Sequence, residues 1–132
     1  MPGRIQDQAH LTVPGPLLSL NTVIDAAKRH WSVYAKEKRG RTSKVALLAQ
    51  AARLKPRTGR VTVRFCWYAQ SGRVDPDNLQ VNSKWCLDGL VEAGVLEDDG
   101  WTTIAGVEHE FHIDTANPRV EIGLRNEETE TT

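Results

Sequence analysis

The segment from Arg60 to Tyr68 places the strongest constraint on the fold, because apolar side chains recur there at every second position. These side chains belong to Val61, Val63, Phe65 and Trp67. A β-strand points successive side chains to opposite faces, so the alternation predicts a strand with one face against a core. A loop at residues 70–73 follows it. Asp75 and Pro76 then have the residue types of a helix N-cap and first helical position, which predicts a helix to about Ala93, ended by Gly94.

The remaining segments predict further strands and helices around this unit. The expected helices are 22–38, stopped by Gly40, and about 44–54, stopped by Pro56. The second helix is expected to bury Val45, Leu47, Leu48, Ala51 and Ala52. Strands are expected at 10–13, 101–107, 108–114 and 119–124, with a turn at Asn117-Pro118. With 132 residues, the chain predicts one α/β domain of the α+β kind over residues 1–126: a mixed sheet with helices packed on it. The acidic tail, 127–132, is expected to be disordered.

The composition argues against membrane and disulfide-stabilised classes of protein. No apolar run approaches the roughly 20 residues that a bilayer span needs, and the polar N-terminus does not look like a signal peptide. We therefore expect a cytoplasmic protein. Cys66 and Cys86 are expected to be buried, reduced thiols rather than a disulfide pair.

Charge is distributed very unevenly, although the net charge is zero. Residues 1–73 hold 14 Lys and Arg against 3 Asp and Glu, and residues 74–132 hold 3 against 14. Such asymmetry indicates a charged partner. A metal-dependent nuclease combines these two features, a basic surface that holds phosphates and an acidic site that holds a cation. The two halves could instead simply neutralise each other across the fold.

The basic half suggests a surface for nucleic-acid phosphates. Residues 28–64 carry 12 Lys and Arg and one acid, Glu37. Contacts to the DNA backbone, which weaken steeply with added salt, are expected rather than reading of bases. A solvated basic face, with Trp31 in the core, is the alternative. The candidate DNA-binding residues are Lys36, Lys38, Arg39, Arg41, Lys44, Arg57, Arg60 and Arg73.

The acidic half centres on the helix predicted after Asp75. At about 100° per residue, Asp77, Lys84 and Asp88 fall within about 40° of one another on one face. Leu79, Cys86, Leu90 and Ala93 lie on the opposite, apolar face. Carboxylates are the ligands that Mg²⁺ prefers, and Mg²⁺ can activate water against a phosphodiester while a lysine stabilises the developing charge. The doublet Asp98-Asp99 would be ~27 Å from Asp75 along an unbroken helix, unless the chain doubles back or the helix is shorter.

Each of these residues also has a purely structural explanation. Asp75 could only cap the helix, Asp77 could only complement its dipole, and Lys84 with Asp88 could be a surface ion pair. The doublet Asp98-Asp99 could be a solvated turn. A zinc site at His109 and His112 is not expected, because the two side chains would point to opposite faces of a strand.

Taken together, the motifs resemble the RusA family of Holliday-junction resolvases. The matching residues are RVDPDNL at 73–79, Lys84, LDGL at 87–90 and EAGVLEDD at 92–99, together with LTVPGP at 11–16 and Asn21. The resemblance implies that Asp75, Asp77 and Asp99 are catalytic metal ligands supported by Asp98, and that Lys84 is the catalytic lysine. Lys84 follows Asp77 by seven residues, whereas better-known members have four, and Val81 at that position cannot replace a lysine.

The resemblance also implies a function and a partner. It implies a homodimer that uses Mg²⁺, with Mn²⁺ as a substitute and no small-molecule cofactor, to cut two strands of a four-way DNA junction symmetrically. Two other functions stay open: a phosphotransferase with an aspartate nucleophile, and a non-catalytic module that binds DNA or protein. The phosphotransferase motif normally follows a buried strand directly, whereas residues 70–73 intervene here.

Overall fold

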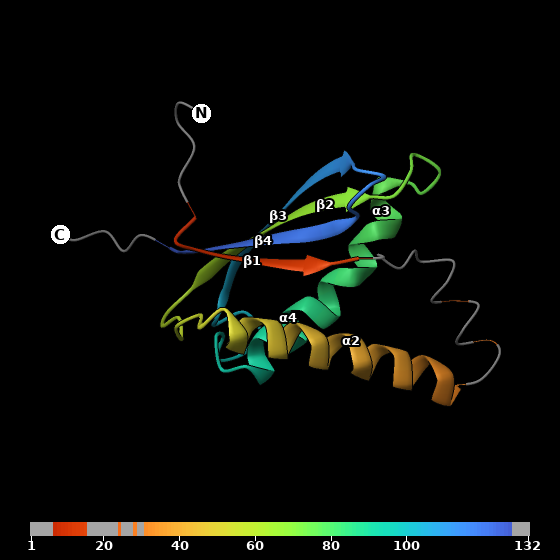
Figure 1. The fold of residues 1–132 in the computed structure, drawn as a ribbon. Coiled ribbons are helices and arrows are strands. Elements are labelled where there is room, and N and C mark those ends of the chain that lie inside the picture. Colours follow the sequence, from red (N-terminus) through yellow and green to blue (C-terminus); the bar gives the residue numbers. More distant parts are fainter. Residues whose placement is uncertain (1–6, 16–23, 25–27, 29–30, 128–132) are drawn as a thin grey trace, which may run out of the picture.

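The fold is a four-stranded mixed sheet with its helices packed on one face (Figure 1). The computed structural model describes residues 7–15, 24, 28 and 31–127. The strands are β1 (Ala9–Pro14), β2 (Val61–Ala69), β3 (Ile104–Ile113) and β4 (Arg119–Asn126), in the order β1-β4-β2-β3. The helices are α2 (Trp31–Ala51), α3 (Pro76–Leu79), the 3-10 turn η1 (Gln80–Asn82) and α4 (Ser83–Glu92). The predicted single α+β domain is confirmed.

The sheet directions follow from the connections between its strands. β2 pairs with β3 in parallel and with β4 antiparallel, and β1 joins the far side of β4 antiparallel. Parallel neighbours need a long crossover, which α3, η1 and α4 provide between β2 and β3. The acidic segment is therefore this crossover, and β3 lies at one edge of the sheet.

The core forms between the inner face of the sheet and the helices. All four alternating residues of β2, from Val61 to Trp67, are fully buried, as the sequence pattern predicts. Leu79, Cys86 and Leu90 meet them from the crossover, which confirms the predicted apolar side of that segment. Cys66 and Cys86 are both buried free thiols, and burial raises the pKa of Cys86 to about 12.

Two expectations for the basic helices were wrong. The chain forms one helix from Trp31 to Ala51, so Gly40 does not stop it. Packing of Val45, Ala46 and Ala49 holds the helix together and outweighs the roughly 1 kcal/mol that an interior glycine costs. Of the apolar side predicted for 44–54, only Val45 is fully buried, whereas Leu47, Ala51 and Ala52 are exposed. Trp31 is also exposed and does not join the core. Apart from 24 and 28, the predicted residues 22–30 lie outside the described part.

The helix predicted after Asp75 is interrupted by the 3-10 turn, although its end is as expected. The side chain of Asn82 is buried, donates to the carbonyl oxygen of Leu79 at 2.8 Å and accepts from Trp85 Nε1 at 3.2 Å. Burying the amide in this way accompanies the tighter winding of residues 80–82. Gly94 follows α4 with φ +79°, a conformation that glycine adopts without strain.

The remaining differences concern the C-terminal strands. Residues predicted as two strands, 101–107 and 108–114, form the single strand β3, which begins only at Ile104. Residues 101–103 make a turn in which the backbone N–H groups of Thr103 and Ile104 both donate to Gly100 O. The turn at Asn117-Pro118 leads into β4 as predicted. No helix in the described part of the chain is long and apolar enough to cross a membrane.

Candidate functional site: an acidic crossover beside a basic helix

The ammonium group of Lys84 joins two carboxylates that are distant in sequence. Lys84 Nζ lies 3.1 Å from Asp88 Oδ1, one helical turn further along α4, and 2.7 Å from Asp99 Oδ2. The chain therefore doubles back after Gly94 and returns Asp99 to the first turn of α4. The hydrogen bond from Lys84 lowers the pKa of Asp99, and the bonds to Asp99 and Asp88 raise the pKa of Lys84. Both groups are thus charged at neutral pH.

Buried neighbours fix the doublet Asp98-Asp99 in place. Val95 and Leu96 just before it are buried, and both of their N–H groups donate to Leu90 O. Asp98 is exposed, and its Oδ1 accepts a hydrogen bond from the backbone N–H of Asp99 at 2.8 Å. The doublet is therefore an anchored turn whose carboxylates face outward, and not an unattached acidic loop.

Asp75 and Asp77 lie at the opposite end of the crossover, at the start of α3. Asp75 has the extended backbone of an N-cap (φ −66°, ψ 144°) and Pro76 follows at the first helical position, as predicted. The Asp75 side chain, however, makes no capping hydrogen bond, so capping does not account for this carboxylate. Asp77 lies in the first turn, and both side chains are exposed.

One chain does not gather all the acidic residues into one site. Within the described residues, no three His, Cys, Asp or Glu side chains lie close enough together to hold a metal ion. Lys84 comes seven residues after Asp77, roughly 10 Å at 1.5 Å per residue, and Asp99 lies beside Lys84. Pro76 lies by the end of β3 at Phe111 and Ile113, whereas Asp99 lies by its start at Ile104. The two acidic groups thus mark opposite ends of β3.

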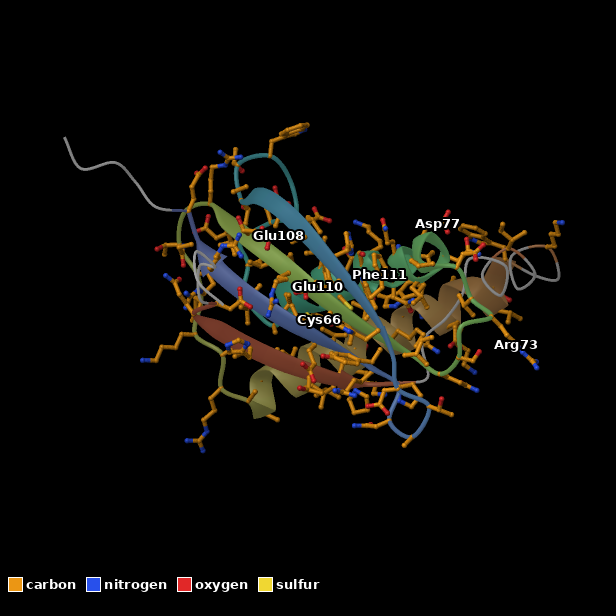
Figure 2. The ribbon with its side chains drawn as sticks, turned by 90° about the horizontal axis from the view of Figure 1, so that it is seen from above. Cys66, Arg73, Asp77, Glu108, Glu110 and Phe111 are labelled. Carbon is orange, nitrogen blue, oxygen red and sulfur yellow. The ribbon has the colours of Figure 1, made fainter. Side chains whose placement is uncertain are left out.

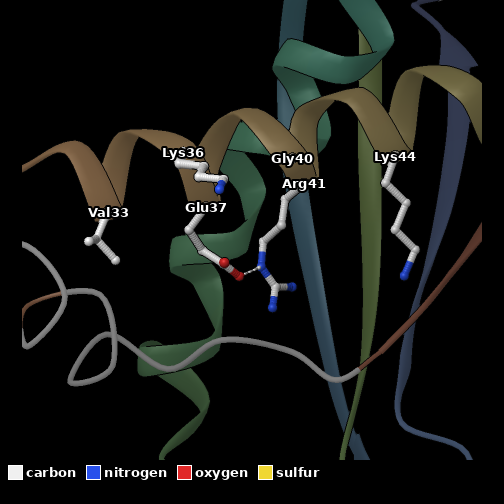
Figure 3. A pocket seen from close by; sticks show the side chains of 6 residues that line it. All are labelled: Val33, Lys36, Glu37, Gly40, Arg41 and Lys44. Carbon is white, nitrogen blue, oxygen red and sulfur yellow. Dashed lines mark hydrogen bonds and ion pairs between the residues drawn. The ribbon is translucent and has the colours of Figure 1, made fainter.

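Most of the predicted DNA-binding residues lie on α2, which packs against α4. Lys38 Nζ is 3.9 Å from Asp88 Oδ2 and so connects the two helices. Lys36 and Arg39 are exposed on the same helix. Arg41 Nε donates to Glu37 at 3.0 Å, and Lys44 Nζ donates to Pro14 O at 3.0 Å. Figure 3 shows Lys36, Arg41 and Lys44 along one side of α2, where they line an open hollow of about 480 Å³.

The other three predicted contacts lie away from α2. Arg57 donates from its side chain to that of Gln8 and from its backbone to Val95 O. Arg60 forms an ion pair with Glu127 at 3.3 Å. Arg73 is exposed in the loop between β2 and α3, and Figure 2 shows it at the same end of the molecule as Asp77. Of these three, Arg73 is the one nearest in sequence to the candidate carboxylates.

The outer face of the sheet carries a charged network that sequence reasoning missed. The buried carboxylate of Asp7 lies 3.0 Å from Arg64 Nε and 3.6 Å from Arg125 Nη1, above Gly123. Arg125 also binds Glu108 through two hydrogen bonds of 3.0 and 2.6 Å. Figure 2 shows Glu108 and Glu110 on β3, two residues apart and therefore on the same face of the sheet. Four separate segments supply these residues, so no local pattern could indicate the network.

The two histidines of β3 face opposite sides of the sheet, as predicted. His109 Nδ1 accepts a hydrogen bond from Trp67 Nε1 at 2.9 Å on the inner face, and burial lowers the pKa of His109. His112 stacks on Tyr68 at a ring-centroid distance of 4.9 Å on the outer face. The pair therefore cannot share a zinc ion.

Comparison with known proteins adds no family assignment. The sequence matches no protein-family model, and no curated protein matches it. Function is therefore inferred from the residues and their arrangement.

Proposed function

We propose that this protein is a Mg²⁺-dependent endonuclease of the RusA type that resolves four-way DNA junctions in the cytoplasm. The observation that carries the proposal is the position of Lys84, held between Asp88 and Asp99 on a helix that packs against the basic helix α2. A cation beside carboxylates, next to a surface for phosphates, is the combination that phosphodiester hydrolysis needs.

The carboxylates have the right chemistry for Mg²⁺. This ion takes one or two carboxylates from a protein and completes its shell with water and substrate phosphate oxygens. Asp75 and Asp77 are exposed and the Asp75 carboxylate is not used as a cap, so these two would hold the ion. When bound, Mg²⁺ would neutralise phosphate charge and lower the pKa of an attacking water, and Mn²⁺ would substitute for it.

Lys84 and the doublet have separate roles in this proposal. Lys84 lies 2.7 Å from Asp99 Oδ2 and lowers the pKa of Asp99, and its positive charge would stabilise the negative charge that develops on a phosphoryl group. Asp99 would be the third metal ligand, and Asp98 would support it through its bond to the Asp99 backbone. The exposed cations of α2, above all Lys36 and Arg39, would hold the DNA backbone alongside.

A homodimer is part of the proposal, because a four-way junction with two symmetric cuts suits a two-fold protein. It also offers a way to unite the acidic groups. Asp75 and Asp77 lie by the end of β3 and Asp99 by its start. A two-fold axis that sets two β3 strands side by side and antiparallel would bring the first group of one subunit towards the second group of its partner.

A cleavage assay on a synthetic four-way junction with Mg²⁺ or Mn²⁺ tests the proposal. Wild type should give paired symmetric nicks, whereas Asp75→Asn and Asp77→Asn should bind the junction without cutting it. Glu97→Gln is the matched control, since Glu97 is an exposed acid outside the proposed set, and it should cut normally. Cutting that persists in both aspartate variants would refute the assignment.

The same assay separates the two alternatives. Junction binding by wild type without cutting in either metal would indicate a non-catalytic DNA-binding module. A stable aspartyl-phosphate on Asp75 or Asp77 after incubation with a phosphate donor would indicate a phosphotransferase.

A further inference from the structure

The turn between α4 and β3 presents a tryptophan ring to solvent. Trp101 is 91% exposed, the highest value among the exposed large apolar residues of the described chain. The turn that carries it is anchored, since Gly100 O accepts from the backbone N–H groups of both Thr103 and Ile104. Thr103 is buried, and its carbonyl oxygen accepts from Val61 N on β2 at 2.7 Å. The ring is therefore held out from the core on a fixed turn, and packing of the core does not account for it.

An open hollow of about 300 Å³ lies beside this ring, at the start of β3. The residues that line it are Asp99, Gly100, Trp101, Ile104, Ala105 and Gly106. Three of them, Gly100, Ala105 and Gly106, carry at most one side-chain carbon and so leave space open in front of their backbone. A flat ring needs little depth, since bases stack about 3.4 Å apart along a DNA strand. The lining therefore combines one large aromatic side chain with room for a flat group.

The strand is irregular at the same place. Between the partners of Val61 and Thr62, β3 contains one extra residue, Ala105. A bulge of this kind redirects the groups around it and is common next to functional sites. No described strand pairs with the outer side of β3, so backbone donors and acceptors on that side can bind a ligand. The hollow thus offers polar backbone groups as well as an aromatic ring.

The hollow adjoins the carboxylate and the ammonium group of the candidate site. Asp99 lines the hollow, and its Oδ2 lies 2.7 Å from Lys84 Nζ. A second cation is also near, because Arg60 Nη2 lies 3.5 Å from the carbonyl oxygen of Ile104. A group that fills the hollow therefore lies next to the residues that act on the phosphate in the proposed function. This position points to a part of the DNA substrate as the occupant.

We propose that this hollow binds one unpaired base of the DNA substrate, which stacks on Trp101 next to the phosphate that is cut. The inference rests on the proposed function for the kind of substrate and adds the feature of that substrate that is recognised. Every base has a π-face, so stacking on tryptophan is favourable whatever the sequence. Bases inside a duplex are already stacked, whereas those at a branch point or in a single strand can be reached. Trp101 therefore favours branched or single-stranded DNA over a paired duplex.

Charge favours a base over a phosphate as the occupant. Of the described residues that line the hollow, Asp99 alone is charged, and Lys84 pairs with it. Glu97 and Asp98, just before it, are exposed acids that repel an anion. A base is neutral at neutral pH, and its polar edge can bond to the backbone groups of β3. The neighbouring phosphate then lies by Lys84 and the metal ion of the proposed function.

Fluorescence anisotropy with labelled DNA, without divalent metal so that no strand is cut, tests the proposal. Trp101→Ala should raise the dissociation constants for a four-way junction and for a single-stranded oligothymidylate by about fivefold or more, the lower limit for the loss of one stacked base. The constant for a paired duplex should not change. Trp101→Phe should keep most of the affinity because it keeps a ring. Thr102→Ala, at an exposed position of the same turn, is the matched control and should bind like wild type.

Two results of this experiment would overturn the proposal. In the first, Trp101→Ala binds all three DNAs as wild type does. In the second, it loses affinity for all three equally, which would indicate a general effect on the surface and not the loss of a stacked base.

A fluorescent base tests the contact itself. An oligothymidylate that carries 2-aminopurine should lose emission when wild type binds, because stacking quenches this base, and should keep it at saturating Trp101→Ala. Equal emission in both complexes would overturn the proposal. Sedimentation without DNA should give the same mass for both proteins, and a lower mass for Trp101→Ala would assign the ring to a protein contact instead. Because no measurement involves cleavage, a wild type that shows this binding pattern but does not cut would refute the nuclease alone.

Discussion

Gly89 of α4 lies directly against Val45 of α2: a Cβ atom at position 89 would stand 2.5 Å from Val45 Cβ and 2.9 Å from Thr42 O. No side chain therefore fits where the basic and the acidic helix cross. We predict that Gly89→Ala lowers the free energy of unfolding by about 1–3 kcal/mol, despite the ~1 kcal/mol that alanine gains over glycine in a helix. Urea denaturation followed by circular dichroism measures this. An unchanged midpoint would mean that the helices separate easily.

Gly40 gives the opposite prediction for the same substitution. It lies inside α2, and a Cβ there would meet nothing within 4 Å. Gly40→Ala should therefore raise the free energy of unfolding by about 0.5–1 kcal/mol, through helix propensity alone. The same urea experiment compares the two variants directly, and a loss of stability in Gly40→Ala would contradict the continuous helix.

Because Lys84 is bonded to Asp99, removing the lysine should change the pKa of the Asp99 carboxyl group. Lys84 lowers the pKa of Asp99 chiefly by its hydrogen bond. In Lys84→Met the pKa of Asp99 should therefore rise towards the ordinary value of about 3.9 for an aspartate. NMR titration of the side-chain carboxyl measures the shift. Glu97→Gln is the control and should leave Asp99 as it is in wild type.

The exposed cations Lys36 and Arg39 should contribute to the salt dependence of DNA binding. Each phosphate contact that is removed should reduce the slope of log K against log salt by about 1. Lys36→Gln and Arg39→Gln should therefore both weaken binding and flatten this slope, without changing sequence preference. Lys55→Gln, an exposed cation beyond the end of α2, is the control. Slopes identical to wild type in both variants would exclude α2 from the DNA surface.

Because of His109, we expect the folded protein to lose stability in mild acid. Burial lowers its pKa below the ordinary value, so the unfolded chain binds its proton more readily. The stabilising contribution is complete above about pH 6.5, the unfolded value, and falls as the pH drops towards the pKa of the folded state. Between pH 7.5 and 5.5, wild type should lose more stability than His109→Phe. An equal loss of stability in His109→Phe over this pH range would contradict the prediction.

Local sequence patterns correctly predicted those helices and strands whose type and limits depend on residues close together in the sequence. The alternation in β2 gave the buried row from Val61 to Trp67, and Asp75-Pro76 and Gly94 marked both limits of the acidic crossover. The break at Gly40 was wrong because packing of Val45 and Ala49 overrides a local preference. The turn at 80–82 was missed because it involves the buried side chain of Asn82, whose burial depends on the whole fold.

The sequence by itself determined the α+β class, the strand and helix types and the chemical kind of the candidate site, because these follow from periodicity and residue type. Only the tertiary structure decided where the carboxylates lie: Asp99 returns to Lys84, while Asp75 and Asp77 stay at the other end of β3. It also decided that no described strand pairs with the outer edge of β3. Both depend on how distant segments fold back on one another, which is set by the packing of the whole core and not by any short stretch of residues.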